Sequence, residues 1–229
     1  MSSLTRSHKL IKRRRAARTA RAFSPRALGP GESGVASSAA QYARCIDAPG
    51  YRSEIIDGVV HVSPSPRRFH QAWSLDIAVA LREFARRSPN VINHVATDND
   101  VVIQHRPGPT RPRPDVTAYH NFPPRSQWLM NDDWTGVCPI LVVEVLSKTR
   151  SRKDIERNRI LYWAAGGIAE YWIVDPQLSP LKPKLTVLVR GMGRHEWTEH
   201  AVPFGRTWKS SMISGLSVSL SDIAKQAGE

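Results

Sequence analysis

Cysteine is scarce in this chain of 229 residues. The only two, Cys45 and Cys138, lie far apart and lack the paired spacing of a zinc site or a redox motif. We expect both to be ordinary buried or half-buried thiols, which fits a reducing compartment. The sequence therefore predicts no disulfide framework and favours a cytoplasmic protein.

Long apolar runs are also missing. The most apolar stretch, residues 137–146, is short and contains Glu144, whereas a membrane-spanning helix needs about 20 consecutive apolar residues. The N-terminus has neither the apolar stretch nor the small-residue cleavage site of a secretory signal. We therefore expect no membrane partner and no export.

Acidic residues are absent before Glu32, whereas nine basic residues lie in the same segment. Subtracting these nine charges from the net charge of +13 leaves +4 for the rest of the chain. Residues 1–38 also offer little that could be buried, so they are predicted to be a disordered basic arm preceding one globular domain at 39–229. Within the arm, the residues expected to contact nucleic-acid phosphates are Arg13, Arg14, Arg15 and Arg18. A leader without function and a mitochondrial transit peptide are alternative interpretations of the same segment.

The pattern of apolar residues after the arm predicts an α/β domain. Asp57-Gly58 lies between two β-branched runs and predicts a tight hairpin. Apolar residues recur at three- and four-residue steps through 67–87, which predicts a long amphipathic helix. The other predicted helices are 39–46, 152–165 and 220–227, and the other predicted strands are 91–96, 100–104, 115–119, 140–146, 170–175, 185–190 and 195–201. The expected architecture is a mixed central sheet flanked by helices.

Glu144 interrupts the most apolar of these strands. An ionised carboxylate inside a core strand costs several kcal/mol unless it is paired or binds a cation. Asp115 opens another strand about thirty positions earlier. If the two strands are neighbours, both carboxylates reach one site, which suits Mg²⁺ with its preference for oxygen ligands. A structural interpretation stays open, in which Glu144 pairs with Arg113 or Lys148 and Asp115 caps its strand.

Several ordered motifs resemble those of the Uma-two family, which has the restriction-endonuclease-like fold of PD-(D/E)XK nucleases. The matching segments are EIIDG at 54–58, SPSP at 63–66 followed by His70, RPDVTAY at 113–119, LVVEVLS at 141–147, and the run from Asp154 through Tyr162 to EYWIVDP at 170–176. The resemblance covers residues 39 to about 225. It implies a metal-dependent endonuclease acting on DNA with Mg²⁺ or Mn²⁺.

The resemblance implies that Asp115 and Glu144 are the first and second acidic metal ligands. The Lys that the superfamily usually has two residues after the second acid is Leu146 here. In the Uma-two family the cation lies on the following helix, four residues after its Asp, and counting from Asp154 gives Asn158. Asp154, Asn158 and Tyr162 are expected to share one helix face. The missing charge could come from Lys148, which follows Glu144 by four, or from Lys153, Arg157 or Arg159.

Two further residues match the family. Glu54 is a candidate third metal ligand, and His70 is a candidate contact to phosphate or water, with a capping or core role as the alternative. Because Asn158 carries no charge, a nucleic-acid-binding protein that keeps the fold without catalysis is the second functional hypothesis. A basic RNA- or ribosome-associated protein is the third. A homodimer is compatible with cleavage of both strands, but no segment marks an interface.

Overall fold

The computed structural model describes residues 26–128, 135–147, 152–177, 179–191 and 196–228, with the side chains of residues 152–154 left out. The helices are α1 (Ala39–Tyr42), α2 (Arg68–Arg87), α3 (Arg152–Ala164) and α4 (Leu220–Gln226), with short 3₁₀ turns η1 (Pro30–Glu32) and η2 (Arg125–Gln127). The strands are β1 (Arg26–Leu28), β2 (Cys45–Asp47), β3 (Tyr51–Ile56), β4 (Val59–Pro64), β5 (His94–Thr97), β6 (Val116–Tyr119), β7 (Leu141–Val145), β8 (Glu170–Asp175), β9 (Lys184–Arg190), β10 (Trp197–Val202), β11 (Trp208–Lys209) and β12 (Ser217–Val218).

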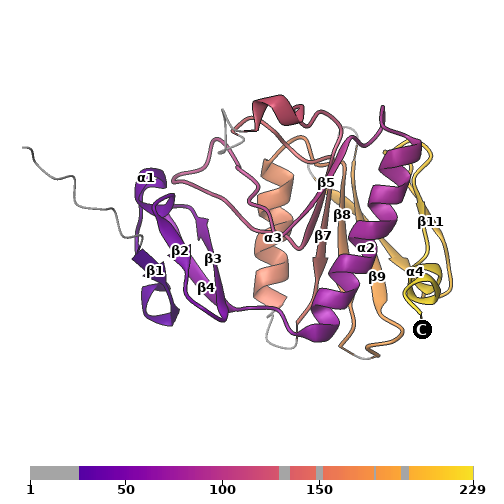
Figure 1. Ribbon diagram of the computed structural model, residues 1–229, viewed down its shortest axis with the longest axis horizontal. Coiled ribbons are helices and arrows are strands. Elements are labelled where there is room, and N and C mark those ends of the chain that lie inside the picture. Colours follow the sequence, from indigo (N-terminus) through magenta and orange to yellow (C-terminus); the bar gives the residue numbers. More distant parts are fainter. Residues whose placement is uncertain (1–25, 129–134, 148–151, 178, 192–195, 229) are drawn as a thin grey trace, which may run out of the picture.

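A mixed sheet of six strands forms the centre of the molecule, in the order β10-β9-β8-β7-β6-β5. The neighbours β7 and β8 are parallel and are connected through α3, whereas the other neighbouring pairs are antiparallel. Helices α2 and α3 lie on opposite sides of this sheet (Figure 1). The predicted α/β architecture, a mixed sheet flanked by helices, is confirmed.

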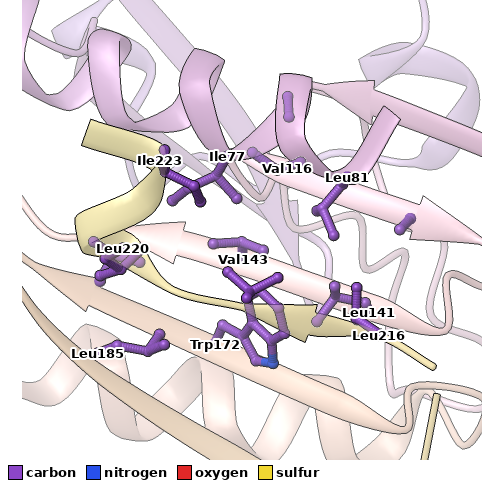
Figure 2. Close-up of a cluster of buried hydrophobic side chains, with 14 of the residues drawn as sticks. Ile77, Leu81, Val116, Leu141, Val143, Trp172, Leu185, Leu216, Leu220 and Ile223 are labelled. Carbon is purple, nitrogen blue, oxygen red and sulfur yellow. The ribbon is translucent and has the colours of Figure 1, made fainter. Parts of the chain in front are cut away.

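The larger core lies between the sheet and the helices α2 and α4. Side chains of a strand alternate between its two faces, so Val143 and Val145 of β7 pack with Trp172 of β8 on this side. Ile77 and Leu81 from α2 approach them, as Figure 2 shows, together with Leu220 and Ile223 at the α4 end. The alternate residues of the same strands, including Val142 and Tyr171, pack on the other side with Tyr162 of α3. Because β7 and β8 are covered on both faces, they are apolar along almost their whole length.

The hairpin β3–β4 lies beside the main sheet and turns at Asp57-Gly58, as predicted. Both turn residues have positive φ, 51° at Asp57 and 81° at Gly58, which is the conformation of a two-residue hairpin turn. The proline-rich loop at residues 106–114 packs against this turn. Arg106 and Thr110 bind the Asp57 carboxylate, and the Gly58 N–H donates to the carbonyl of Pro109 at 2.9 Å.

Gly108 makes the closest part of this contact. A Cβ at Gly108 would lie 2.6 Å from the carbonyl carbon of Asp57, which is too close for any side chain. On the far side of the loop, the Arg111 N–H donates to the carbonyl of Ile55 in β3 at 2.6 Å. The loop therefore fixes the hairpin along its length.

Three sequence predictions need correction. The ordered chain begins before residue 39, because β1 pairs in parallel with β2 and buries Leu28 at 4% exposure. This pairing also takes Cys45 and Ile46 out of the predicted helix 39–46, because they belong to β2, and the observed helix α1 ends at Tyr42. Residues 100–104 form no strand: the N–H groups of Val101 and Ile103 donate to the proline-rich loop, whose prolines cannot complete a ladder. Residues 1–25 of the predicted arm lie outside the described residues.

Glu170 at the start of β8 is fully buried, with 0% exposure. Its carboxylate accepts hydrogen bonds from the indoles of Trp172 and Trp208, at 2.8 and 3.0 Å, and from the hydroxyl of Ser210 at 2.5 Å. Glu170 thus attaches the segment around β11 to the sheet.

Among the described residues, none of the helices combines the length and the apolar composition needed to cross a membrane.

We predict that Glu170→Ala lowers the free energy of unfolding by about 3 kcal/mol, because it leaves three donors without an acceptor. Glu170→Gln should cost less, since its carbonyl oxygen keeps part of the network. Glu199→Ala is the control, because that side chain is 50% exposed and pairs with Arg159 at the surface; it should cost less than about 1 kcal/mol. Chemical denaturation measures all three, and equal losses for Glu170→Ala and Glu199→Ala would contradict the structural role of Glu170.

Candidate active site

Asp115 directly precedes β6, and Glu144 lies in the antiparallel neighbour β7. The register pairs Val116 of β6 with Val143 of β7, so Asp115 and Glu144 are the next residues beyond that pair. Asp115 is 4% and Glu144 1% exposed. The condition set from the sequence, that the two strands be neighbours, is met by β6 and β7.

Glu144 is held by α3. Its Oε1 accepts hydrogen bonds from the Asn158 amide, at 2.9 Å, and from the Tyr162 hydroxyl, at 2.7 Å. The two donors lie four residues apart on one helix face, as predicted, and both are fully buried. Asp154 also belongs to α3, but its side chain lies outside the described residues. Both donors are neutral, so they orient the Glu144 carboxylate without neutralising its charge.

Asp115 is held by three different elements. Its Oδ2 accepts a hydrogen bond from the backbone N–H of Val145 at 2.7 Å, and its Oδ1 lies 3.0 Å from Nη1 of Arg52 in β3. Nε2 of His70, at the start of α2, lies 2.9 Å from the same Oδ1. That contact is not aligned as a hydrogen bond, and Nδ1 of this buried ring has no partner among the described residues.

Glu54 lies against a cation of α3. Its Oε1 accepts a 2.5 Å hydrogen bond from Nη2 of Arg157, which also donates to Oδ1 of Asn158 at 3.1 Å. Contacts therefore run from Glu144 through Asn158 and Arg157 to Glu54. Within the described part of the chain, no three His, Cys, Asp or Glu side chains are grouped to hold a metal ion, so Glu54 does not form a three-acid cluster with Asp115 and Glu144.

Lys148 and the arm residues Arg13, Arg14, Arg15 and Arg18 lie outside the described residues. Arg113, considered above as a partner of Glu144, instead pairs with Asp47, at 2.6 Å, and with Asp98, at 3.1 Å.

Sequence reasoning missed Arg52. The signal was present, because strand alternation places Arg52 on the same face of β3 as Glu54, two residues away. Their partners, however, lie 63 and 103 residues further along the chain. Only the folded chain shows which acid each of them meets.

A polar cavity of about 430 Å³ adjoins this centre, lined by the acids Asp47, Asp98 and Asp100 and by Arg111 and Arg113. Burial raises the pKa of Asp100 to about 6, although the nearby guanidinium of Arg113 opposes the shift. Asp100 therefore ionises at a higher pH than an ordinary aspartate. The cavity contains both hydrogen-bond donors and acceptors close to Asp115.

The donor set around Asp115 and Glu144 fits a small divalent cation. Two carboxylates side by side supply hard oxygen ligands, and Mg²⁺ is commonly held by one or two carboxylates with water in the remaining positions. The unpartnered ring nitrogen of His70 next to Asp115 adds a polar atom that bound water could satisfy.

Comparison with known proteins identifies the family of the chain. The family model described as "Putative restriction endonuclease", Uma2, matches residues 39–221. A crystal structure of "a putative nuclease belonging to DUF820 from Anabaena variabilis ATCC 29413" superimposes with a TM-score of 0.58 at 16% identity, covering 81% of this chain and 96% of that one. No curated protein matches the chain. Since the family model spans well over half of the sequence, the chain belongs to the Uma2 family.

Proposed function

We propose that this chain is a metal-dependent endonuclease that hydrolyses phosphodiester bonds in DNA, with Asp115 and Glu144 as the ligands of Mg²⁺ or Mn²⁺. The observation that carries the proposal is the contact of the buried Asp115 carboxylate with the backbone N–H of Val145, the residue directly after the buried Glu144. Family membership and the nuclease fold of the structural neighbour support it.

The ion would supply two kinds of chemistry when bound: a lowered pKa for a coordinated water and stabilisation of charge on the phosphate. The protein's own residues prepare the site. Asn158 and Tyr162 orient the Glu144 carboxylate, and the Val145 N–H orients that of Asp115. Such fixed hydrogen bonds reduce the reorganisation needed during reaction.

Arg157 is the described cation best placed to meet the phosphate. Its guanidinium contacts Asn158, which holds Glu144, and its side chain is 25% exposed. It also lines a separate pocket of about 320 Å³ together with Arg106 and His61. We propose that Arg157 supplies the charge that Asn158 lacks. An Arg fork can bind two phosphate oxygens at once.

The neutral Asn158 also favours a second candidate, a DNA-binding protein without catalysis. The Asn158 amide donates to Glu144 and its carbonyl accepts from Arg157, so the side chain is occupied by structural contacts. Binding without cleavage would identify this alternative.

The two acids can be tested by amide substitutions that preserve shape. We predict that Asp115→Asn and Glu144→Gln each reduce Mg²⁺-dependent plasmid nicking at least about 10²-fold, since each removes a charged ligand. Asp222→Asn is the control, because its side chain is 63% exposed. EDTA should abolish cleavage by the native protein. Full cleavage by both amide variants would assign the activity to another site.

The role of Arg157 can be tested against a matched arginine. Arg157→Gln should lower kcat on the order of 10²-fold, as expected for loss of a donor to transition-state charge, and Asn158→Lys in that variant should restore part of it. Arg106→Gln is the control: Arg106 also pairs with an acid, Asp57, has 24% side-chain exposure and lines the same pocket. Single-turnover cleavage of a labelled duplex measures all four proteins, and equal effects at Arg106 and Arg157 would remove Arg157 from the mechanism.

The basic N-terminal segment can be tested through salt dependence. Residues 1–25 contain eight basic residues and no acids, so their deletion should weaken DNA binding. Each phosphate contact contributes about 0.9 to the slope of log K against log salt concentration, so the slope should flatten by several units. Fluorescence anisotropy with a labelled duplex in EDTA measures this, and an unchanged slope would show that this segment makes no phosphate contacts.

A further inference from the structure

Arg52 lies between two carboxylates of very different exposure. Its Nη1 is 3.0 Å from Oδ1 of Asp115 and 3.7 Å from Oδ1 of Asp98. The side chain of Asp115 is 2% exposed and that of Asp98 is 53% exposed. One guanidinium therefore has a buried acid and a largely exposed acid within its reach.

The two acids are fixed relative to each other. The backbone N–H of Asp98 donates to the backbone carbonyl of Asp115 at 3.1 Å. Asp98 adopts a positive φ of 54°, which is uncommon for a residue other than glycine. The guanidinium of Arg113 contacts both oxygens of the Asp98 carboxylate, with Nε 3.1 Å from Oδ1 and Nη2 3.1 Å from Oδ2. Arg52 therefore shares Asp98 with Arg113 and lies closer to Asp115.

A divalent ion at Asp115 changes this balance. An arginine cannot lose its proton in a protein, so Arg52 cannot relieve the repulsion between its own charge and the ion by titrating. The ion and the guanidinium compete for the same Asp115 oxygen. Asp98 offers Arg52 a second negative partner, with which it can pair without competing with the ion for Asp115.

We infer that Arg52 is a positioning residue that sets the affinity of the Asp115–Glu144 centre for divalent ions by exchanging between Asp115 and Asp98. Without the ion, its charge holds the buried Asp115 carboxylate in place. With the ion bound, Arg52 moves to Asp98, at the edge of the polar cavity. This inference rests on the proposed function, because it requires that the two acids bind an ion.

The test is Mn²⁺ binding by isothermal titration calorimetry on the full chain without DNA. Arg52→Gln should lower Kd about tenfold, because the competitor is gone, and Arg52→Lys should stay near the native value, because the charge remains. Asp98→Asn should raise Kd several-fold, because the displaced Arg52 loses its second partner. Arg106→Gln and Asp57→Asn form the control pair, joined by a similar ion pair elsewhere on the hairpin, and should stay within about twofold. Circular dichroism establishes that each variant is folded.

The double variant Arg52→Gln/Asp98→Asn distinguishes exchange of Arg52 between the two acids from a direct effect of the Asp98 charge on the bound ion. If Asp98 acts through Arg52, Asp98→Asn should have no effect on Kd in the Arg52→Gln background, whereas two independent charge effects would add. Additive effects would overturn the exchange, and so would an Arg52→Gln affinity within twofold of the native value. In either case, Mn²⁺ binding that depends on Asp115 and Glu144 would still support the proposed function. Absence of Mn²⁺ binding in both the native protein and Arg52→Gln would overturn the ion site and the inference together.

Discussion

The burial of two carboxylates side by side is the constraint on which the centre of this molecule depends. The register of β6 with β7 places Asp115 and Glu144 directly beyond one residue pair, and two adjacent negative charges removed from water are unfavourable unless donors or cations surround them. The surrounding elements supply these groups: α3 provides Asn158 and Tyr162, and β3 provides Arg52. The hairpin β3–β4, α2 through His70, and α3 therefore all contact the residues at one end of β6 and β7.

Burial of an acid is not by itself a sign of chemistry, as Glu170 shows. Glu170 is as inaccessible as Glu144, but its register partners Leu141 and Val189 are apolar, and two indoles and a hydroxyl bind its carboxylate. Neutral donors of this kind attach one segment of chain to another. Asp115 and Glu144 differ from Glu170 because they are buried near each other, with Asp115 bound to the N–H of the residue after Glu144.

The parts of the fold that could be predicted from the sequence are those set by local patterns. The apolar run around Glu144, the three- and four-residue periodicity of α2 and the Asp57-Gly58 turn each carry their own signal. The parallel pairing of β1 with β2 has no local signal, so the ordered chain was predicted to begin too late and α1 to end too late.

In the candidate site, too, some contacts follow from local sequence patterns and others do not. The shared face of Asn158 and Tyr162 follows from the helix period. The approach of Asp115 to Glu144 was predicted only on the condition that their strands are neighbours, which they are. The contacts of Arg52 and Arg157 join the hairpin to distant elements, and residue spacing carries no information about such contacts. The identity of the cation near Asn158 therefore depends on three-dimensional structure.

The close approach of Gly108 to the hairpin turn has a mechanical consequence for the centre. The backbone that carries Gly108 against Asp57 runs on through Arg111, bound to β3, and within a few residues becomes Asp115. The segment from Gly108 to Asp115 is thus held against the hairpin at two points, at Asp57 and at Ile55. The position of Asp115 is therefore tied to the same hairpin that carries Arg52 and Glu54.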